Sequence, residues 1–422
     1  MVKKLIVILI LLAFLCGCGA GVQKPTKPAQ TLPTEETTAA DPTGYVVNGI
    51  MEYPDYTFDE APTVLTQRLK AVRAFKDLLS IRWSTAIPIT YNKTGPVSEK
   101  TFQHAIDTTY AGTIYSNAST GIFQFLEFYD FETGRLSYPG EVEEMKETIG
   151  ASCADAMIWG VTTVCNSLTG PYYPVSMVYK NGYLPVGDYT YDYSISSYNY
   201  CPTQKIVEEN GAKVMLEAYT KVRPGDMFTS TPDNHGMMAI SVPTVVYKND
   251  GSIDLEKSYI NIQDQRAGTG KGFYEVKEGG EIIRYSGRTT AKFTFKQLLD
   301  KAYIPVTTAE FAGLKEYEKA TVTASGECTS LEELLTLKVE SNYPLAVLNV
   351  IVADKFDNEH VIGRNIFSGA NKGGVPREFA LSEMECLTTF AESEYNVSTY
   401  IIKIEVVPST GERFVPIQFE IP

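Results

Sequence analysis

Cys153 is the residue of this sequence whose type and position best fit a nucleophile. It follows Gly150-Ala151-Ser152 and heads an apolar stretch, Ala154 to Val164, whose pattern favours a helix. At the start of a helix, unpaired backbone N–H groups and the positive end of the helix dipole favour a thiolate, which is the reactive form of cysteine. The same position also suits a cysteine that is simply buried as a small apolar side chain. Catalysis therefore requires a base close to Cys153.

Three histidines are available as that base. His104 lies in a helix-like run and His360 lies in a predicted C-terminal β-sandwich among Asn358, Glu359 and Val361, so both are expected to be surface or structural residues. His235 follows the turn-rich segment Ser230-Thr231-Pro232-Asp233-Asn234 and opens an apolar strand predicted over Met237 to Tyr247. An imidazole placed where a loop enters a sheet can take the thiol proton and later protonate a leaving amine.

Asp264 is the candidate for the group that orients the imidazole. It lies in the predicted strand Tyr259 to Gln265, where alternation places it on the same face as two isoleucines, Ile260 and Ile262. A carboxylate on an apolar face needs a polar partner, and a neighbouring imidazole provides one. Gln263 takes this role if the register is shifted by one residue, and a simple charge on an edge strand is the structural alternative.

The order of these motifs resembles that of the NlpC-type cell-wall peptidases and the related CHAP-type amidases. In that superfamily a cysteine heads a helix, a Pro-Gly-Asp turn leads into a strand, and a histidine follows, as Cys153, Pro224-Gly225-Asp226 and His235 do here. The resemblance covers roughly residues 105 to 268. It implies a papain-like fold and a Cys-His-Asp mechanism with peptidoglycan or a peptide as the substrate.

The resemblance also implies a role for Tyr115. A tyrosine upstream of the cysteine often helps to bind the oxyanion in these families, and the segment Tyr110 to Tyr115 resembles that region. The chain departs from the family at the cysteine, where Ser152-Cys153-Ala154-Asp155 replaces the common Asp-Cys-Ser-Gly. The gaps between its motifs are also longer than those of the family, which leaves the substrate open.

Other chemistries have little support in the sequence. It contains no HExxH or CxxC pair and no Walker or dinucleotide-binding glycine motif, so we expect neither a metal nor a cofactor. Transglutaminase-like proteins use Cys, His and Asp in the same order, so acyl transfer is an alternative to hydrolysis. A non-catalytic surface lipoprotein that binds glycan or peptide through its aromatic residues is an alternative of a different class.

The elements predicted around these residues indicate an α+β protein. Helices are expected over Asp59 to Ser80, where Leu65, Leu69, Val72, Phe75 and Leu79 form an apolar stripe, and over Glu141 to Ile149. Short strands at Gly272 to Lys277 and Glu281 to Ser286, and a helix at Phe295 to Lys301, complete a papain-like catalytic domain predicted over residues 45–320. Alternating runs then predict an accessory, immunoglobulin-like β-sandwich over residues 321–422, whose partner the sequence does not identify. Its strands are expected at Leu335–Glu340, Leu345–Ala353, Val361–Phe367, Glu378–Leu381, Thr399–Val407 and Phe414–Ile421.

The N-terminus resembles a bacterial lipoprotein signal. Lys3 and Lys4 precede an apolar run, Leu5 to Leu15, that is shorter than the roughly 20 residues needed to span a bilayer. Leu15-Cys16-Gly17-Cys18 resembles a lipobox, which predicts a signal peptide over residues 1–17 and lipidation of Cys18. Residues 18–44 are rich in Thr, Ala, Gln and Pro and predict a flexible tether. We therefore expect the protein to be lipid-anchored on the extracytoplasmic face of the cell membrane.

Charge and cysteine count limit the partners and crosslinks. The formal charge of −14 becomes −16 once Lys3 and Lys4 are removed, which disfavours nucleic acid as a partner. The mature chain keeps five cysteines besides Cys18, so at least one is unpaired. Pairs between Cys165 and Cys201 and between Cys328 and Cys386 are compatible with the sequence, and so are buried free thiols.

Overall fold

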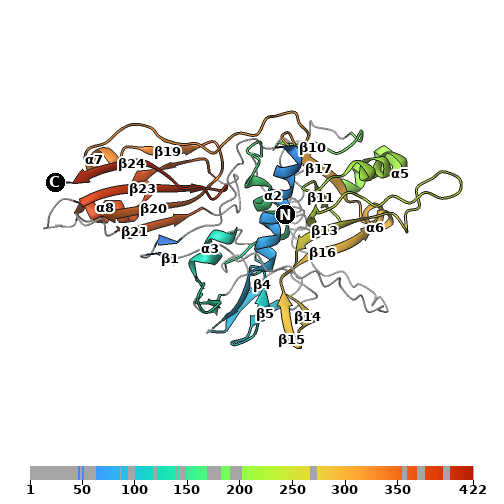
Figure 1. Cartoon of the computed structure of the whole chain (residues 1–422), viewed down its shortest axis with the longest axis horizontal. Coiled ribbons are helices and arrows are strands. Elements are labelled where there is room, and N and C mark those ends of the chain that lie inside the picture. Colours follow the sequence, from blue (N-terminus) through green and yellow to red (C-terminus); the bar gives the residue numbers. More distant parts are fainter. Residues whose placement is uncertain are drawn as a thin grey trace, which may run out of the picture.

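The computed structural model describes residues 46–47, 50–51, 63–85, 87–93, 100–116, 121–138, 141–142, 149–168, 182–190, 202–266, 273–353, 359–367, 376–392 and 400–421. The predicted signal peptide, Cys18, the tether and Cys201 lie outside these residues. The described part is a mixed α+β fold of several small sheets and a few helices (Figure 1). Within it, no helix combines the length and the apolar character needed to cross a bilayer.

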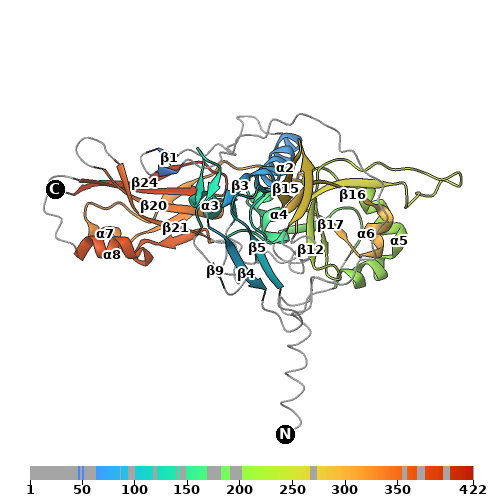
Figure 2. The same ribbon diagram turned by 90° about the horizontal axis from the view of Figure 1, so that it is seen from below.

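A six-stranded antiparallel sheet, here called the central sheet, carries His235 and Asp264. Its strands in spatial order are β10 (Tyr183–Pro185), β17 (Ile304–Thr308), β11 (Met227–Ser230), β12 (His235–Ala239), β13 (Tyr259–Gln265) and β16 (Gly287–Thr294). Helices α2 (Val64–Ser80) and α4 (Cys153–Thr162) lie on one side of this sheet, and α5 (Thr203–Lys221) and α6 (Phe295–Asp300) lie on the other (Figures 1 and 2). Strand β13 has the predicted bounds, whereas β12 ends at Ala239, well before the predicted end at Tyr247.

Helix α2 forms where the sequence predicts a helix, and Phe75 and Leu79 of the predicted apolar stripe are buried, but the N-terminal half of the helix buries a different face. Leu65 and Leu69 of the predicted apolar stripe are 59% and 47% exposed, while Arg68 is only 7% exposed. The buried face is continued by Ala71, Ala74, Phe75, Leu78 and Leu79. The reason for the rotation is an ion pair between Arg68 and Asp226, 2.7 Å long, which fixes the N-terminal half of the helix against the turn before β11.

Smaller sheets flank α2 and correct two predictions. One sheet has the order β14 (Tyr274–Glu278), β15 (Glu281–Tyr285), β6 (Tyr110–Ala111), β3 (Arg82–Thr85), β8 (Arg135–Leu136) and β7 (Tyr129–Asp130). A separate two-stranded sheet pairs β1 (Val46–Val47) with β2 (Ile50–Met51). A third sheet joins β5 (Lys100–His104), β4 (Ile89–Lys93) and β9 (Glu141–Val142). His104 therefore lies in a strand instead of a helix. The helix predicted from Glu141 begins as a strand because residues 141–142 pair with β4, and residues 143–148 lie outside the described part.

Two helices in this half of the chain were not predicted. Helix α3 (Gly121–Glu127) is short, and α5 is interrupted at Gly211, whose φ of 77° is not helical. Charged and polar residues dominate α5, and its hydrophobic stripe is weak. Its position is fixed instead by tertiary contacts, because the Tyr219 hydroxyl donates a 2.7 Å hydrogen bond to the Tyr303 carbonyl oxygen.

Residues 321–421 form two small sheets that share one hydrophobic core, here called the C-terminal unit. One sheet has the order β18 (Val322–Ala324), β19 (Lys338–Ser341) and β22 (Glu378–Ala380). The other has the order β21 (Glu359–Ile366), β20 (Leu345–Ala353), β23 (Tyr400–Pro408) and β24 (Phe414–Ile421). The strand predicted from Leu335 begins only at Lys338, because residues 331–334 form helix α7 (Leu331–Leu334). The short helices η3 (Leu381–Glu383) and α8 (Glu385–Glu392) complete the unit. Val339, Val350 and Ile404 belong to the shared core.

Candidate active site

Cys153 is the first residue of α4, as predicted, and it is 5% exposed. Ser152 caps the helix: its hydroxyl accepts a hydrogen bond from the Asp155 backbone N–H at 3.5 Å, and the Asp155 carboxylate accepts from the Ser152 N–H at 3.3 Å. This reciprocal pair fixes the first turn of α4. The helix lies close against α2, since a Cβ at Gly160 would come within 2.8 Å of the Ala71 carbonyl oxygen.

Tyr115 lies beside the chain that leads into α4. Its backbone forms a parallel bridge with Ala151, and the neighbouring hydrogen bonds join Ala151 N to Ile114 O at 3.0 Å and Ser116 N to Ala151 O at 3.2 Å. Gly150 permits this approach because its φ is +136° and any Cβ there would clash with Ile114. The segment of Tyr115 and the start of α4 are therefore adjacent.

The Pro-Gly-Asp turn is held by an arginine that sequence analysis did not assign to the site. Arg68 donates from Nη1 to Asp226 Oδ1 at 2.7 Å and to the Pro224 carbonyl oxygen at 2.9 Å. It also donates from Nη2 to the Phe311 carbonyl oxygen at 2.8 Å. The spacing of apolar residues along α2 gives no sign of this ion pair, because its partner, Asp226, lies 158 residues away in the sequence.

His235 and Asp264 are in direct contact on β12 and β13. His235 Nε2 lies 2.8 Å from Asp264 Oδ2, and Asp264 is fully buried. Arg288 binds the same carboxylate twice, with Nε 2.8 Å from Oδ1 and Nη2 2.6 Å from Oδ2. Burial by itself raises the pKa of the Asp264 carboxyl, but the charge and hydrogen bonds of Arg288, followed by those of His235, outweigh it and hold that pKa well below its usual value.

The ionised state of Asp264 determines which imidazole nitrogen is basic. An ionised carboxylate only accepts hydrogen bonds, so His235 Nε2 carries the proton and Nδ1 has the free lone pair. Burial lowers the pKa of His235 by more than the contact with Asp264 raises it, and Arg266 and Arg288 lower it further. The imidazole is therefore neutral at pH 7 and has the form of a general base.

Gln263, the runner-up for the orienting role, faces the other way. Its Nε2 donates to the Val72 carbonyl oxygen of α2 at 2.9 Å, and its register partner is Met238. A register shift between Ile262 and Asp264 in the pairing of β13 with β16 leaves both Gln263 and Asp264 buried. The structure thus brings Asp264, and not Gln263, into contact with His235.

Cys153 reaches the same end of the sheet from the side of α4. Its Sγ lies 4.0 Å from the carbonyl oxygen of Asn234, the residue before His235. Gly236 faces α4, because a Cβ built there would lie 3.7 Å from the Ala154 Cα. Since successive side chains of a strand leave opposite faces, the His235 side chain leaves the face of α5 and α6. The thiol and the imidazole therefore flank one turn, residues 231–234, from the two faces of the sheet.

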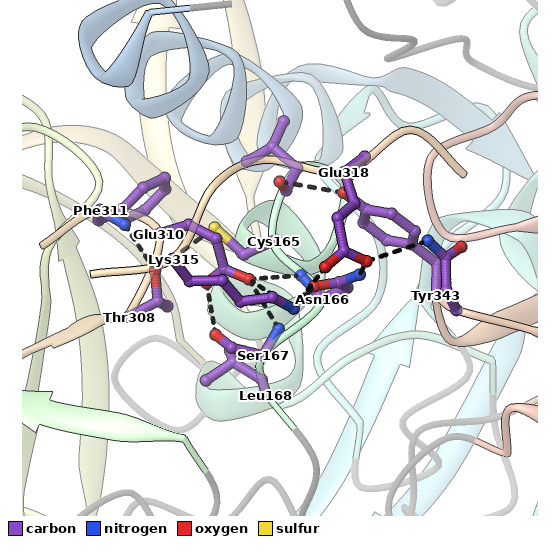
Figure 3. Close-up of polar contacts among 12 residues, drawn as sticks. Cys165, Asn166, Ser167, Leu168, Thr308, Glu310, Phe311, Lys315, Glu318 and Tyr343 are labelled. Carbon is purple, nitrogen blue, oxygen red and sulfur yellow. Dashed lines mark hydrogen bonds and ion pairs between the residues drawn. The ribbon is translucent and has the colours of Figure 1, made fainter. Parts of the chain in front are cut away.

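The chain that follows the opposite end of α4 enters a partly buried polar network at the boundary with the C-terminal unit (Figure 3). Glu310 Oε1 accepts hydrogen bonds from the backbone N–H groups of Asn166 at 3.2 Å and Ser167 at 2.9 Å. The Tyr343 hydroxyl donates to the carbonyl oxygens of Glu318 at 2.9 Å and Val164 at 3.3 Å. We call Asn166, Ser167, Glu310, Lys315, Glu318 and Tyr343 the junction network.

Two further side chains of the C-terminal unit bind the carbonyl oxygens at this end of α4. Ser409 Oγ donates to Thr162 O at 2.7 Å. Arg377 Nη2 donates to Asn166 O at 2.6 Å and to Leu168 O at 3.1 Å. These carbonyl oxygens would otherwise lack partners after the last helical turn, and a cation there opposes the negative end of the helix dipole.

The remaining cysteines and histidines play no visible part in the site. Cys165, Cys328 and Cys386 are free thiols, so the pair between Cys328 and Cys386 is not formed. His104 packs against both Trp83 and Tyr110, with ring centroids 5.3 and 4.7 Å away, and burial lowers its pKa to about 3. In the part of the chain that the structure describes, no group of three or more His, Cys, Asp or Glu side chains is arranged to hold a metal ion.

Comparison with known proteins adds no relative to this geometry. No protein-family model matches the chain, and neither a curated protein nor a solved structure matches it.

Proposed function

We propose that this chain is a lipid-anchored, extracytoplasmic cysteine hydrolase that cleaves an amide or peptide bond, with peptidoglycan as its expected substrate. Cys153 is the nucleophile, His235 the general base and acid, and Asp264 the orienting residue, on a papain-like arrangement similar to that of the NlpC-type peptidases. One observation carries the proposal. His235 contacts Asp264 at 2.8 Å, and Cys153 Sγ lies 4.0 Å from the carbonyl oxygen of Asn234, the residue before His235, so all three candidate residues meet at one turn.

The chemistry assigns a step to each group. His235 Nδ1 accepts the thiol proton, and the Cys153 thiolate adds to the scissile carbonyl carbon. The backbone N–H of Cys153 and the Tyr115 hydroxyl stabilise the oxyanion. The imidazolium then protonates the leaving amine, and water hydrolyses the thioester to release the acid and restore the thiol. The thiol and the imidazole lie at the same turn, 231–234, and catalytic hydrogen bonds are commonly loose in a free enzyme.

The decisive experiment compares digestion of purified cell wall by the wild-type chain and by Cys153→Ala. The loss of turbidity and the release of amino groups measure the rate. Cys386→Ala is the matched control because it also removes a free thiol. We expect at least a roughly 10³-fold loss of rate for Cys153→Ala and no loss for the control. A Cys153→Ala protein that digests wall at the wild-type rate would contradict the proposal.

A non-catalytic surface lipoprotein that binds glycan or peptide is the second candidate. The observation that favours it is the orientation of β12, in which Gly236 and not His235 faces α4. This function predicts saturable binding to wall fragments that survives His235→Ala. It also predicts no preferential alkylation of Cys153 by iodoacetamide at neutral pH, whereas the hydrolase requires pH-dependent labelling of that thiol, read by mass spectrometry.

A further inference from the structure

Two arginines lie beside Asp264 on the face of α5 and α6. Arg288 engages the carboxylate through two hydrogen bonds, whereas Arg266 Nε lies 3.6 Å from Oδ2, an ion-pair distance that is too long for a hydrogen bond. Within the described residues, the Arg266 guanidinium donates no hydrogen bond. Its side chain is 30% exposed, so part of it is in contact with solvent.

The charges around Arg266 do not balance. Asp264 provides one negative charge for two guanidinium groups, and His235 is neutral at pH 7 because of its lowered pKa. The nearby Asp233 is already occupied, since it accepts hydrogen bonds from Lys301 and from the Tyr303 hydroxyl, both at 2.8 Å. Burial raises the pKa of the neighbouring phenol of Tyr274, which therefore stays neutral. Among the residues that the structure describes around Asp264, one positive charge is left over in a half-buried position.

We propose that Arg266 binds a carboxylate of a ligand next to His235, so that this face holds a carboxylate subsite for an acylated amino acid or a peptide with a free C-terminus. A guanidinium presents paired donors that match both oxygens of a carboxylate. A monoanion balances the single surplus charge. The net charge of the chain is −14, so its overall field repels anions and only a local cationic site retains them. The subsite goes beyond the proposed hydrolysis and needs no bond cleavage.

The experiment measures binding of N-acetylglycine and of its neutral analogue N-acetylglycinamide to the full chain at low salt. Titration calorimetry gives the two Kd values, and the ring signal of His235 in proton NMR reports the location. This signal can be resolved because the chain has only three histidines. We expect the wild type to bind the carboxylate at least roughly tenfold more tightly than the amide, with a shift of the His235 signal.

Variants assign this preference to Arg266. Arg266→Gln is expected to bring the ratio of the two Kd values close to one, and Arg266→Lys to reduce it several-fold, because an ammonium group lacks the paired donors. Lys292→Gln is the control, since it removes one positive charge from β16 of the same sheet and its Nζ lies over the Tyr259 ring. If Arg266→Gln does not fold, Arg266→Lys decides.

Three results would overturn the subsite. The wild type could bind both compounds equally, the Arg266 variants could keep the wild-type ratio of the two Kd values, or Lys292→Gln could lose the preference for the carboxylate as much as Arg266→Gln does. None of them depends on wall digestion. A wild-type chain that binds the carboxylate but leaves cell wall intact would contradict the hydrolase and support the subsite.

Discussion

The two ends of α4 are built in different ways. At its N-terminus, Cys153 is held by a local capping pair, Ser152 and Asp155, and by the short bridge between Ala151 and Tyr115. At its C-terminus, the chain is bound by residues more than 140 positions away, among them Glu310 and residues of the C-terminal unit. The candidate nucleophile thus lies at the less crosslinked end of a helix whose other end is anchored. Stability and thiol reactivity should therefore respond to different substitutions.

Glu310→Ala should cause the largest loss of stability. The buried Glu310 carboxylate accepts from the Asn166 and Ser167 backbone N–H groups and from the Ser167 hydroxyl, all of which lose their partner. We expect the free energy of unfolding to fall by about 3 kcal/mol in urea titrations. Alkylation of Cys153 at a temperature well below the transition should stay within about twofold of wild type. The exposed neighbour Glu316→Ala is the control, and a loss of equal size there would refute the assignment.

Arg377→Ala should have the next largest effect. It removes the cation that binds the carbonyl oxygens of Asn166 and Leu168 beyond the end of α4. A loss of about 2 kcal/mol is expected from these charge-assisted hydrogen bonds. Lys338→Ala removes an exposed cation of the same unit and should leave the unfolding midpoint close to that of the wild type. If Arg377→Ala unfolds at the wild-type midpoint, the C-terminal unit does not anchor α4 through this residue.

Ser152→Ala tests the reactive end. It removes the hydroxyl that caps the first turn of α4, which should cost about 1 kcal/mol of stability. In contrast to the junction variants, it should slow alkylation of Cys153 several-fold, because the first-turn N–H groups near the thiolate are no longer fixed. Ser167→Ala, which changes a serine at the other end of α4, serves as the comparison. Equal alkylation rates in the two variants would show that the ends do not differ.

Parts of the molecule with strong local signals were predictable from the sequence. Strands Tyr259–Gln265, Leu345–Ala353 and Phe414–Ile421 have their predicted bounds because alternation or an unbroken apolar run marks them. Cys153 at a helix start and the pairing of His235 with Asp264 also agree with the sequence analysis. These features depend on residues that are close together in sequence, or on a buried carboxylate that needs a partner.

Features that depend on long-range pairing could not be predicted. The burial of Arg68 in α2 depends on its partner, Asp226, which lies 158 residues away. The start of the helix predicted from Glu141 is wrong because residues 141–142 pair with β4, which overrides a local charge pattern. The side of the sheet on which the His235 side chain lies depends on how Gly236 packs against α4. The order of cysteine, turn and histidine in the sequence does not show which side this is.

A smaller effect at the reactive end concerns the titration of His235. Burial lowers its pKa below the usual 6.5, contact with Asp264 opposes this, and Arg288 adds to the lowering. The neutral imidazole, which is the base, therefore persists below pH 6.5, and an unfolded chain binds more protons there than the folded one. The stability contributed by His235 is consequently present above pH 6.5 and decreases as the pH falls below it. Removing one of the nearby arginine cations should therefore raise the pKa of His235.

Arg288→Gln should raise the midpoint of the His235 titration, since it deletes one of the two nearby guanidinium charges that lower the His235 pKa while the other remains. Titration of the His235 ring signal by NMR measures this shift, and Lys292→Gln should leave the midpoint unchanged. The acid limb of any Cys153-dependent hydrolysis should move to higher pH by the same amount in Arg288→Gln, because a smaller fraction of the imidazole is then the free base at pH 6. A limb that stays in place while the NMR midpoint moves would mean that His235 is not the base, and the thiol on the α4 face would then have to work without it.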